Sequence, residues 1–179
     1  MNNLLPILYL FILISSLGLL LFFLIQQIFQ KREKENELSL LQQKLRSGSI
    51  NYFEHYSLGV IYLSKKLFDQ AIIQFSYALK KWDALDIPGL ANLYNTIGFT
   101  YFESEQFDLA IYYYKESINL IPNYIIALNN LAYAYEKKKS LRDAIHTYKK
   151  VLSYDEKNIT ASEKFQSLTR RIKNRDDRI

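Results

Sequence analysis

The sequence predicts an all-α protein in which one N-terminal transmembrane helix precedes a solenoid of three helical repeats and a C-terminal capping helix. Two observations support this prediction. A long block near the N-terminus is apolar and uncharged, and a pattern of small and aromatic residues recurs through the remainder of the chain. Repetition at a fixed period indicates a repeat architecture, so it takes precedence over local propensity.

Residues 4–25 form the apolar block. At 1.5 Å per residue this block spans about 33 Å, which is enough to cross the hydrocarbon core of a bilayer. A cleaved signal peptide would instead need a basic start, a shorter apolar core and a cleavage site of small residues. Met1-Asn2-Asn3 carries no basic side chain and no A-x-A motif follows. We therefore expect an uncleaved anchor over residues 1–30.

The charges that flank the block predict its orientation. Lys31, Arg32 and Lys34 follow it, and no Lys or Arg precedes it. By the positive-inside rule, the C-terminal bulk of the chain stays on the cytoplasmic side or its organellar equivalent. The same charges are also compatible with the simple start of a solvated helix.

Residues 31–51 are expected to form a helical stalk and a hinge. Leu38, Leu41 and Leu45 make one short apolar stripe, which favours packing on the first repeat over a coiled coil. The break at Ser47-Gly48-Ser49 is the expected hinge. Asn51 with Glu54 has the pattern of a capping box that opens the next helix.

An internal repeat organises the chain from residue 52 to residue 158. Its clearest copy covers residues 91–124 and contains Tyr94, Ile97, Gly98, Tyr101, Ala110, Tyr114, Ser117 and Pro122. The pattern returns 34 residues later in residues 125–158, as Leu128, Leu131, Ala132, Tyr135, Ala144, Tyr148 and Val151. It also stands 39 residues earlier in residues 52–85, as His55, Leu58, Gly59, Tyr62, Ala71, Phe75 and Ala78. The difference between 39 and 34 is an insertion at residues 86–90, which we expect to lengthen the corner between two repeats.

Each repeat has the spacing of two packed helices. Gly98 and Tyr101 share one face of the first helix, and Ala110 and Tyr114 share one face of the second. Small residues allow close approach, and Pro122 ends the second helix because it lacks an N–H. One hairpin is too small to bury its own apolar face, so three must stack into a continuous core.

These residues resemble the tetratricopeptide repeat family, whose 34-residue unit places an aromatic residue, Leu-Gly, Tyr, Ala, Phe and Pro at matching positions. The chain departs from that pattern at three positions. His55 replaces an aromatic residue, and Asp83 and Glu156 stand in the proline position. Those positions vary within the family, so the resemblance still implies the fold.

The order of anchor, stalk, three repeats and basic C-terminal helix resembles the membrane-anchored tetratricopeptide proteins of algal plastid genomes and cyanobacteria, which are implicated in photosystem I assembly. The resemblance implies a single-pass protein of the plastid thylakoid membrane with its repeats facing the stroma. Its protein clients would be photosystem I subunits or assembly intermediates. The alternatives are a bacterial inner-membrane scaffold for an unrelated envelope complex and an adaptor that engages lipid or RNA.

Residues 159–179 are expected to form a basic capping helix and tail. Thr160 and Glu163 have capping-box spacing, and Phe165, Leu168 and Ile172 make an apolar stripe. A terminal repeat needs a lid with a polar outer face. A basic patch for membrane or nucleic acid is the alternative interpretation, although a nucleic-acid partner is not expected from a net charge of only +5.

The sequence offers little material for catalysis. It has no Cys, and its histidines, His55 and His146, show no metal-ligand spacing. The five glycines are scattered, so no phosphate loop is present. We expect no cofactor, no metal and no enzymatic activity.

A partner-binding groove is the expected functional site. In the resembled family, the first helix of each repeat lines the concave face of the solenoid. Amides there can bond to the backbone of an extended peptide, and aromatic rings supply contact area. The residues carried over to this face are Tyr56, Asn92, Asn95, Phe99, Phe102, Asn129, Asn130 and Tyr133. Alternatively, the capping helix or the stalk fills the groove.

The same face argues against one known use of the fold. Tetratricopeptide clamps that hold acidic chaperone C-termini use Lys or Arg together with Asn. Tyr56, Val60 and Ile126 stand here in such positions, so a cytosolic chaperone cofactor is disfavoured.

Overall fold

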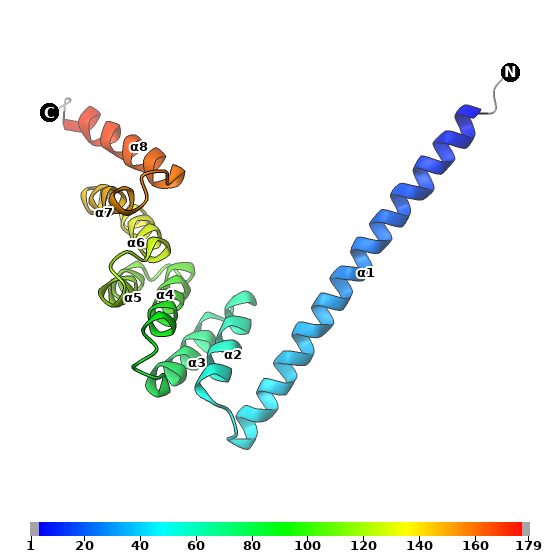
Figure 1. Cartoon of the computed structure of the whole chain (residues 1–179), viewed down its shortest axis with the longest axis horizontal. Helices are drawn as coiled ribbons and strands as arrows, with labels where there is room; N and C mark the ends of the chain where they lie inside the picture. The colour runs from blue at the N-terminus through cyan, green and yellow to red at the C-terminus, as the bar shows by residue number, and fades with distance from the viewer. Residues whose placement is uncertain (1–3, 177–179) are drawn as a thin grey trace. The chain divides into compact units, whose positions relative to one another are not determined.

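A computed structural model describes residues 4–176 and shows eight α-helices and no strand in that part of the chain (Figure 1). The chain divides into two compact units, Met1–Ile50 and Asn51–Ile179. The all-α prediction is therefore confirmed.

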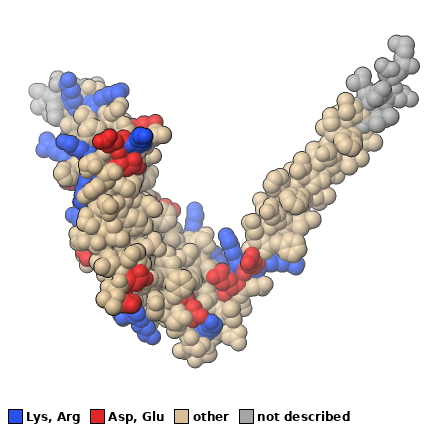
Figure 2. Space-filling model, viewed as in Figure 1, with Lys and Arg blue, Asp and Glu red and all other residues tan. Residues whose placement is uncertain are grey.

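The first compact unit is one helix, α1 (Leu4–Ser47). The large apolar side chains described between Leu8 and Phe29 are exposed, and Figure 2 shows this stretch without charged atoms. Its mean hydropathy reaches 2.7, so α1 is long and apolar enough to cross a membrane. The helix continues into the predicted stalk and ends at Ser47, and Gly48 follows with a φ of 71°.

The second compact unit consists of three helical hairpins and one further helix, each packed against the next along the chain. The first helices of the hairpins are α2 (Tyr52–Ser64), α4 (Ile87–Glu103) and α6 (Ile125–Lys137). The second helices are α3 (Phe68–Lys81), α5 (Phe107–Leu120) and α7 (Leu141–Tyr154), and α8 (Ile159–Asp176) follows them.

Local signals explain the helix boundaries. The predicted capping box opens α2, because the Glu54 N–H donates to Asn51 Oδ1 at 2.8 Å and the Asn51 N–H donates to Glu54 Oε2 at 2.9 Å. The turn inside each hairpin contains one non-glycine residue with positive φ, at Lys66, Glu105 and Lys139. These residues are equivalent in the three repeats, and each allows the next N–H to bond back to a Tyr carbonyl, as Gln106 does to Tyr101 at 2.9 Å.

The core lies between the two helices of each hairpin and between successive hairpins. Its largest fully buried side chains include Phe75, Tyr114 and Tyr148. A Cβ added at Gly98 would lie 2.8 Å from Cδ1 of Tyr114, and one added at Gly59 would lie 2.5 Å from Cε1 of Phe75. The small residues of the repeat are therefore required by the aromatic rings that face them.

The insertion at residues 86–90 lengthens the corner by one residue only, since residues 82–86 join α3 to α4 and residues 121–124 join α5 to α6. Asp86 caps α4 through its Oδ1, which accepts a hydrogen bond from the Gly89 N–H at 2.9 Å, and Pro88 lies in the first turn of α4. Proline is favoured there because the first helical N–H groups have no acceptor within the helix. The insertion therefore extends α4 to 17 residues, compared with 13 in α2 and α6.

The predicted capping box at Thr160 is also wrong. The helix α8 already begins at Ile159, and the side chain of Asn158 caps it by accepting from the Ala161 N–H at 3.0 Å. Asn is a stronger N-cap residue than Thr, which explains why α8 starts before Thr160.

We expect Gly98→Leu to destabilise the repeats. The new side chain would meet the buried Tyr114 ring and the Ala110 carbonyl oxygen, which lies 3.2 Å from the added Cβ. Such overpacking costs about 1–3 kcal/mol, which exceeds the roughly 0.8 kcal/mol gained by replacing a helical glycine. Thermal unfolding of the full-length chain in detergent micelles, followed by circular dichroism, should show a lower midpoint.

The matched control is Ser76→Leu, which introduces the same side chain at an exposed position of α3. An unchanged midpoint in Gly98→Leu would show that the helix pairing described above is wrong.

Candidate partner-binding groove

The eight candidate residues lie on the first helices of the three repeats, and we call them the groove face. Tyr56 lies on α2, four members lie on α4 and three lie on α6. Six of the eight contact another member directly, and each of these contacts joins two successive repeats, in the pairs Tyr56–Asn92, Asn95–Asn130 and Phe102–Tyr133.

Asn92 connects α4 to α2 and to Tyr124, the residue at the N-cap of α6, through its side-chain amide. Its Nδ2 donates to the Tyr56 hydroxyl at 3.0 Å, and its Oδ1 accepts from the Tyr124 hydroxyl at 3.3 Å. Burial and the neighbouring Tyr56 raise the pKa of Tyr124, so this hydroxyl remains a donor at neutral pH. Asn92 is thus used for cohesion between repeats.

The two amides that occupy equivalent positions in successive repeats differ. Asn95 is only 8% exposed, and its Oδ1 accepts from Asn130 Nδ2 at 3.0 Å. In α6, the Oδ1 of Asn129 is buried and has no hydrogen-bond partner among the described residues. Asn95 therefore contributes to the packing of the repeats, whereas Asn129 has an acceptor that the fold does not use.

An exposed apolar stripe crosses the groove face at one repeat position. Val60, Phe99 and Tyr133 occupy equivalent places on α2, α4 and α6, and their side chains are 38%, 40% and 37% exposed. The Tyr133 ring lies 5.1 Å from that of Phe102, measured between ring centres. Three partly exposed apolar side chains in register form a surface on which an extended chain can bury its own apolar groups.

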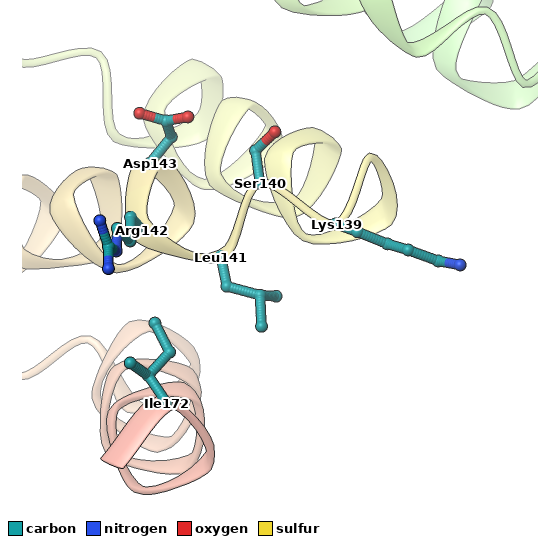
Figure 3. A pocket seen from close by; sticks show the side chains of 6 residues that line it. All are labelled: Lys139, Ser140, Leu141, Arg142, Asp143 and Ile172. Atoms are coloured by element: carbon teal, nitrogen blue, oxygen red, sulfur yellow. The ribbon is translucent and has the colours of Figure 1, made fainter. Parts of the chain in front are cut away.

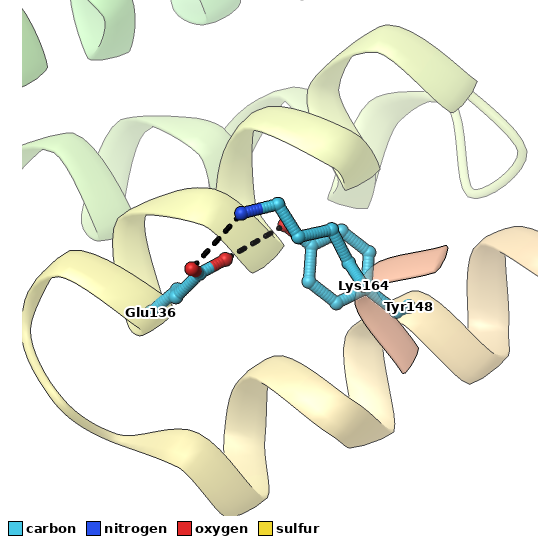
Figure 4. Close-up of polar contacts among 3 residues, drawn as sticks. All are labelled: Glu136, Tyr148 and Lys164. Atoms are coloured by element: carbon cyan, nitrogen blue, oxygen red, sulfur yellow. Dashed lines mark hydrogen bonds and ion pairs between the residues drawn. The ribbon is translucent and has the colours of Figure 1, made fainter. Parts of the chain in front are cut away.

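Helix α8 adds a polar cluster that the sequence analysis did not assign to the groove (Figure 4). Lys164 of α8 donates to Glu136 Oε1 at 3.0 Å, and the Tyr148 hydroxyl lies 3.4 Å from Glu136 Oε2. Burial and the Glu136 carboxylate raise the pKa of Tyr148, which keeps its hydroxyl protonated. The 34-residue period could have predicted that Lys164 lies beside the groove face, because Lys164 stands 34 residues after Asn130.

A pocket of about 380 Å³ remains between α6, α7 and α8, so α8 lines this part of the groove without filling it. We call it the α8 pocket. Its walls are formed by Asn129, Asn130, Tyr133, Tyr148, Thr160 and Lys164.

A second hollow of about 250 Å³ lies beside the turn that joins α6 to α7 (Figure 3). Lys139, Ser140, Leu141, Arg142 and Asp143 from that turn line it, and Ile172 of α8 lies across from Leu141. It lacks the aromatic wall of the groove face, and we assign it no function.

The histidines have structural or solvent-exposed environments. His55 is buried, with its Nδ1 2.8 Å from Gln74 Oε1, and its ring stacks on Tyr77. His146 is exposed on α7. Within the described residues, no group of His, Cys, Asp or Glu side chains could hold a metal ion.

We expect Asn92→Ala and Asn129→Ala to affect stability differently. The two substitutions change helix propensity by the same amount. Asn92→Ala removes two hydrogen bonds, one to Tyr56 of the first repeat and one to Tyr124 at the N-cap of α6, and should cost about 1–2 kcal/mol. Asn129→Ala removes a buried oxygen that has no partner, so the unfolding midpoint should stay unchanged or rise. Thermal unfolding of the full-length chain in detergent micelles measures both, and equal losses would contradict the assigned roles.

Comparison with known proteins agrees with the repeat structure. A sequence model of the tetratricopeptide repeat matches residues 91–124 and 125–158. These are the bounds expected for the second and third repeats. A solved structure of similar shape is that of YrrB, described as a tetratricopeptide-repeat protein with an unusual peptide-binding site. It has a TM-score of 0.67 and 20% identity, and the match covers 82% of this chain and 73% of YrrB. That likeness concerns the fold alone.

Two relatives are similar in sequence over most of this chain. The ycf37 protein of Guillardia theta is 46% identical over 179 residues, which is the full length of both proteins. The chloroplastic tetratricopeptide repeat domain-containing protein PYG7 of Arabidopsis thaliana is 34% identical over 92% of this chain, which spans about half of PYG7, 54% of its length. The chain therefore belongs to the ycf37 family of tetratricopeptide-repeat proteins.

Proposed function

We propose that this protein is a membrane-anchored scaffold of the plastid thylakoid that binds photosystem I subunits or assembly intermediates and assists their assembly or stability. The observation that carries the proposal is the exposed apolar stripe of the groove face. The layout shared with membrane-anchored tetratricopeptide proteins of plastids and cyanobacteria supports the choice of photosystem I as the client.

The groove face is suited to binding and not to chemistry. Its described residues present amides, hydroxyls and rings, and a nucleophile next to a general base is absent from them. A tetratricopeptide solenoid presents an extended surface to its partners. We therefore propose a non-enzymatic role that depends on contact area along several repeats.

Three aromatic or aliphatic side chains in register favour a client in extended conformation. Val60, Phe99 and Tyr133 come from three different helices, so one client segment that runs across the repeats can contact all of them. Aromatic side chains contribute large contact area with little loss of conformational entropy. The amides of Asn92 and Asn95 mainly position this surface, since each bonds to the neighbouring repeat.

The membrane assignment rests on α1 and on the relatives. The helix α1 is long and apolar enough to anchor the chain in a bilayer, and PYG7 is a chloroplastic protein by its description. Lys31, Arg32 and Lys34 follow the apolar stretch directly, which favours retention of the repeats on the stromal side.

We expect the double change Phe99→Ala and Tyr133→Ala to weaken client capture. Truncating an aromatic side chain at the centre of an interface typically costs about 2 kcal/mol or more, so binding should fall at least tenfold. The measurement is affinity capture with the tagged full-length protein from detergent-solubilised thylakoids, followed by identification and quantification of the photosystem I subunits.

The matched control is Tyr77→Ala with Tyr112→Ala, which removes two exposed rings from the second helices α3 and α5. Capture that is equally reduced by the control pair would mean that the groove face is not the binding surface. Recovery of other membrane complexes in place of photosystem I subunits would overturn the assigned client.

The proposed orientation of the chain in the thylakoid membrane can be tested with protease. Protease added to right-side-out thylakoids should degrade residues 51–179 and leave a protected fragment that contains the α1 apolar stretch, because the basic flank opposes translocation. Immunoblotting with antibodies to each end of the chain follows the fragments. Repeats that are protected in right-side-out thylakoids but cleaved in inverted vesicles would show the opposite orientation.

A further inference from the structure

The α8 pocket contains a buried acceptor that the fold does not use. Asn129 lines the pocket, and its Oδ1 has no donor among the described residues. Buried carbonyl oxygens without hydrogen bonds are uncommon in folded proteins, and each requires an explanation. A ligand that supplies an N–H in the pocket would satisfy this oxygen.

The pocket also has a cationic edge. The Nζ atoms of Lys137 and Lys164 lie 5.2 Å and 5.5 Å from the centre of the Tyr133 ring. Lys164 is paired with Glu136, and within the described part of the chain no carboxylate pairs with Lys137. Of these two ammonium groups, only that of Lys164 is therefore paired with a carboxylate among the described residues, which leaves a positive excess next to the pocket.

The size and the wall of the pocket limit what can enter. At about 380 Å³ it lies near the lower end of the volume range of ligand pockets. The Tyr133 ring, supported by Phe102, gives it an aromatic wall. The pocket therefore suits one large apolar side chain with its flanking backbone.

We propose that the α8 pocket binds an extended client segment in which an apolar residue is followed by an acidic residue. The apolar side chain packs against Tyr133, and its backbone N–H donates to Asn129 Oδ1. The neighbouring carboxylate pairs with Lys137 and Lys164. Rotation of the Asn129 side chain about its own torsions brings the oxygen toward the entering N–H.

This inference rests on the proposed function and names the client chemistry at one end of the groove. It differs from the acidic clamp that the sequence argues against, because the positions where that clamp needs Lys, Arg or Asn hold Tyr56, Val60 and Ile126 in this chain. Here one cation, Lys164, comes from α8 and the other, Lys137, from the last turn of α6.

The test uses the full-length protein in detergent micelles and a capped probe peptide, acetyl-Gly-Ser-fluorophenylalanine-Asp-Ser-Gly-amide. Fluorine NMR of the probe measures its dissociation constant, even where binding is weak. A second probe carries an N-methyl group on the fluorophenylalanine nitrogen, which removes the proposed N–H donor. A third probe has Asn in place of Asp. All three probes lack charged termini.

We expect saturable binding of the first probe, with about tenfold loss on N-methylation, as for one hydrogen bond to a buried acceptor. In Asn129→Ala the N-methyl probe should bind as well as the parent probe, because the acceptor is gone. Replacing Asp by Asn in the probe should weaken binding to the wild type, and the loss should be smaller with Lys164→Met, which leaves only Lys137 to pair with the carboxylate. The control variants are Asn119→Ala and Lys149→Met, which change exposed residues of α5 and α7 and should leave all three affinities unchanged.

An equal loss on N-methylation in the wild type and in Asn129→Ala would overturn the assigned hydrogen bond. Equal binding of the Asp and Asn probes to the wild type would overturn the acidic preference. Each loss is measured between two probes on the same protein, so a general loss of affinity in Asn129→Ala cancels. Capture of photosystem I subunits tests the proposed function separately, since failed capture with intact probe binding would reject the client and keep the pocket.

Discussion

Close approach between the two helices of each hairpin is the constraint on which the rest of the structure depends. The rings of Phe75 and Tyr114 lie where a side chain on Gly59 or Gly98 would stand. The helix spacing in the first two hairpins is therefore set by a ring against a glycine, which is a steric requirement. Because the spacing repeats, the first helices of successive hairpins fall into register, and equivalent residues on them come within reach of one another.

That register divides the groove face into two kinds of residue. The amides of Asn92 and Asn95 bond to side chains of neighbouring repeats, so they stabilise the surface from within. Phe99 and Tyr133 remain partly exposed and supply the area on which a partner can pack. The sequence does not reveal which of the amides are paired, because these amides all belong to asparagines. Whether an amide is paired depends on whether a side chain on the neighbouring helix points toward it. Asn129 shows the point, since it occupies the same repeat position as Asn95 and has an unpaired oxygen.

Most of the fold could be predicted from the sequence, because period, capping and glycine positions are local signals with a physical cause. The Asn51 capping box and the small residues Gly59 and Gly98, each of which faces a ring, are examples. Two features could not be predicted in this way. The insertion at residues 86–90 forms a helical turn because Asp86 caps it. A Pro-Gly pair usually indicates a corner, so the sequence pattern favoured a longer corner over a longer helix. The pairing of groove amides depends on side-chain directions between helices that a repeat pattern does not specify.

The position of α8 explains how one helix can both end the solenoid and complete the groove. Counted by the period, α8 is the first helix of a further repeat, and no second helix covers it within residues 4–176. Its uncovered side must therefore be soluble, and Arg170, Arg171 and Lys173 are exposed there. Figure 2 shows basic side chains gathered at this end of the repeats. Lys164 differs from these exposed basic residues, because the repeat register places it against Glu136 of α6. This ion pair holds α8 against α6, as a lid requires, and it also places Lys164 at the wall of the α8 pocket.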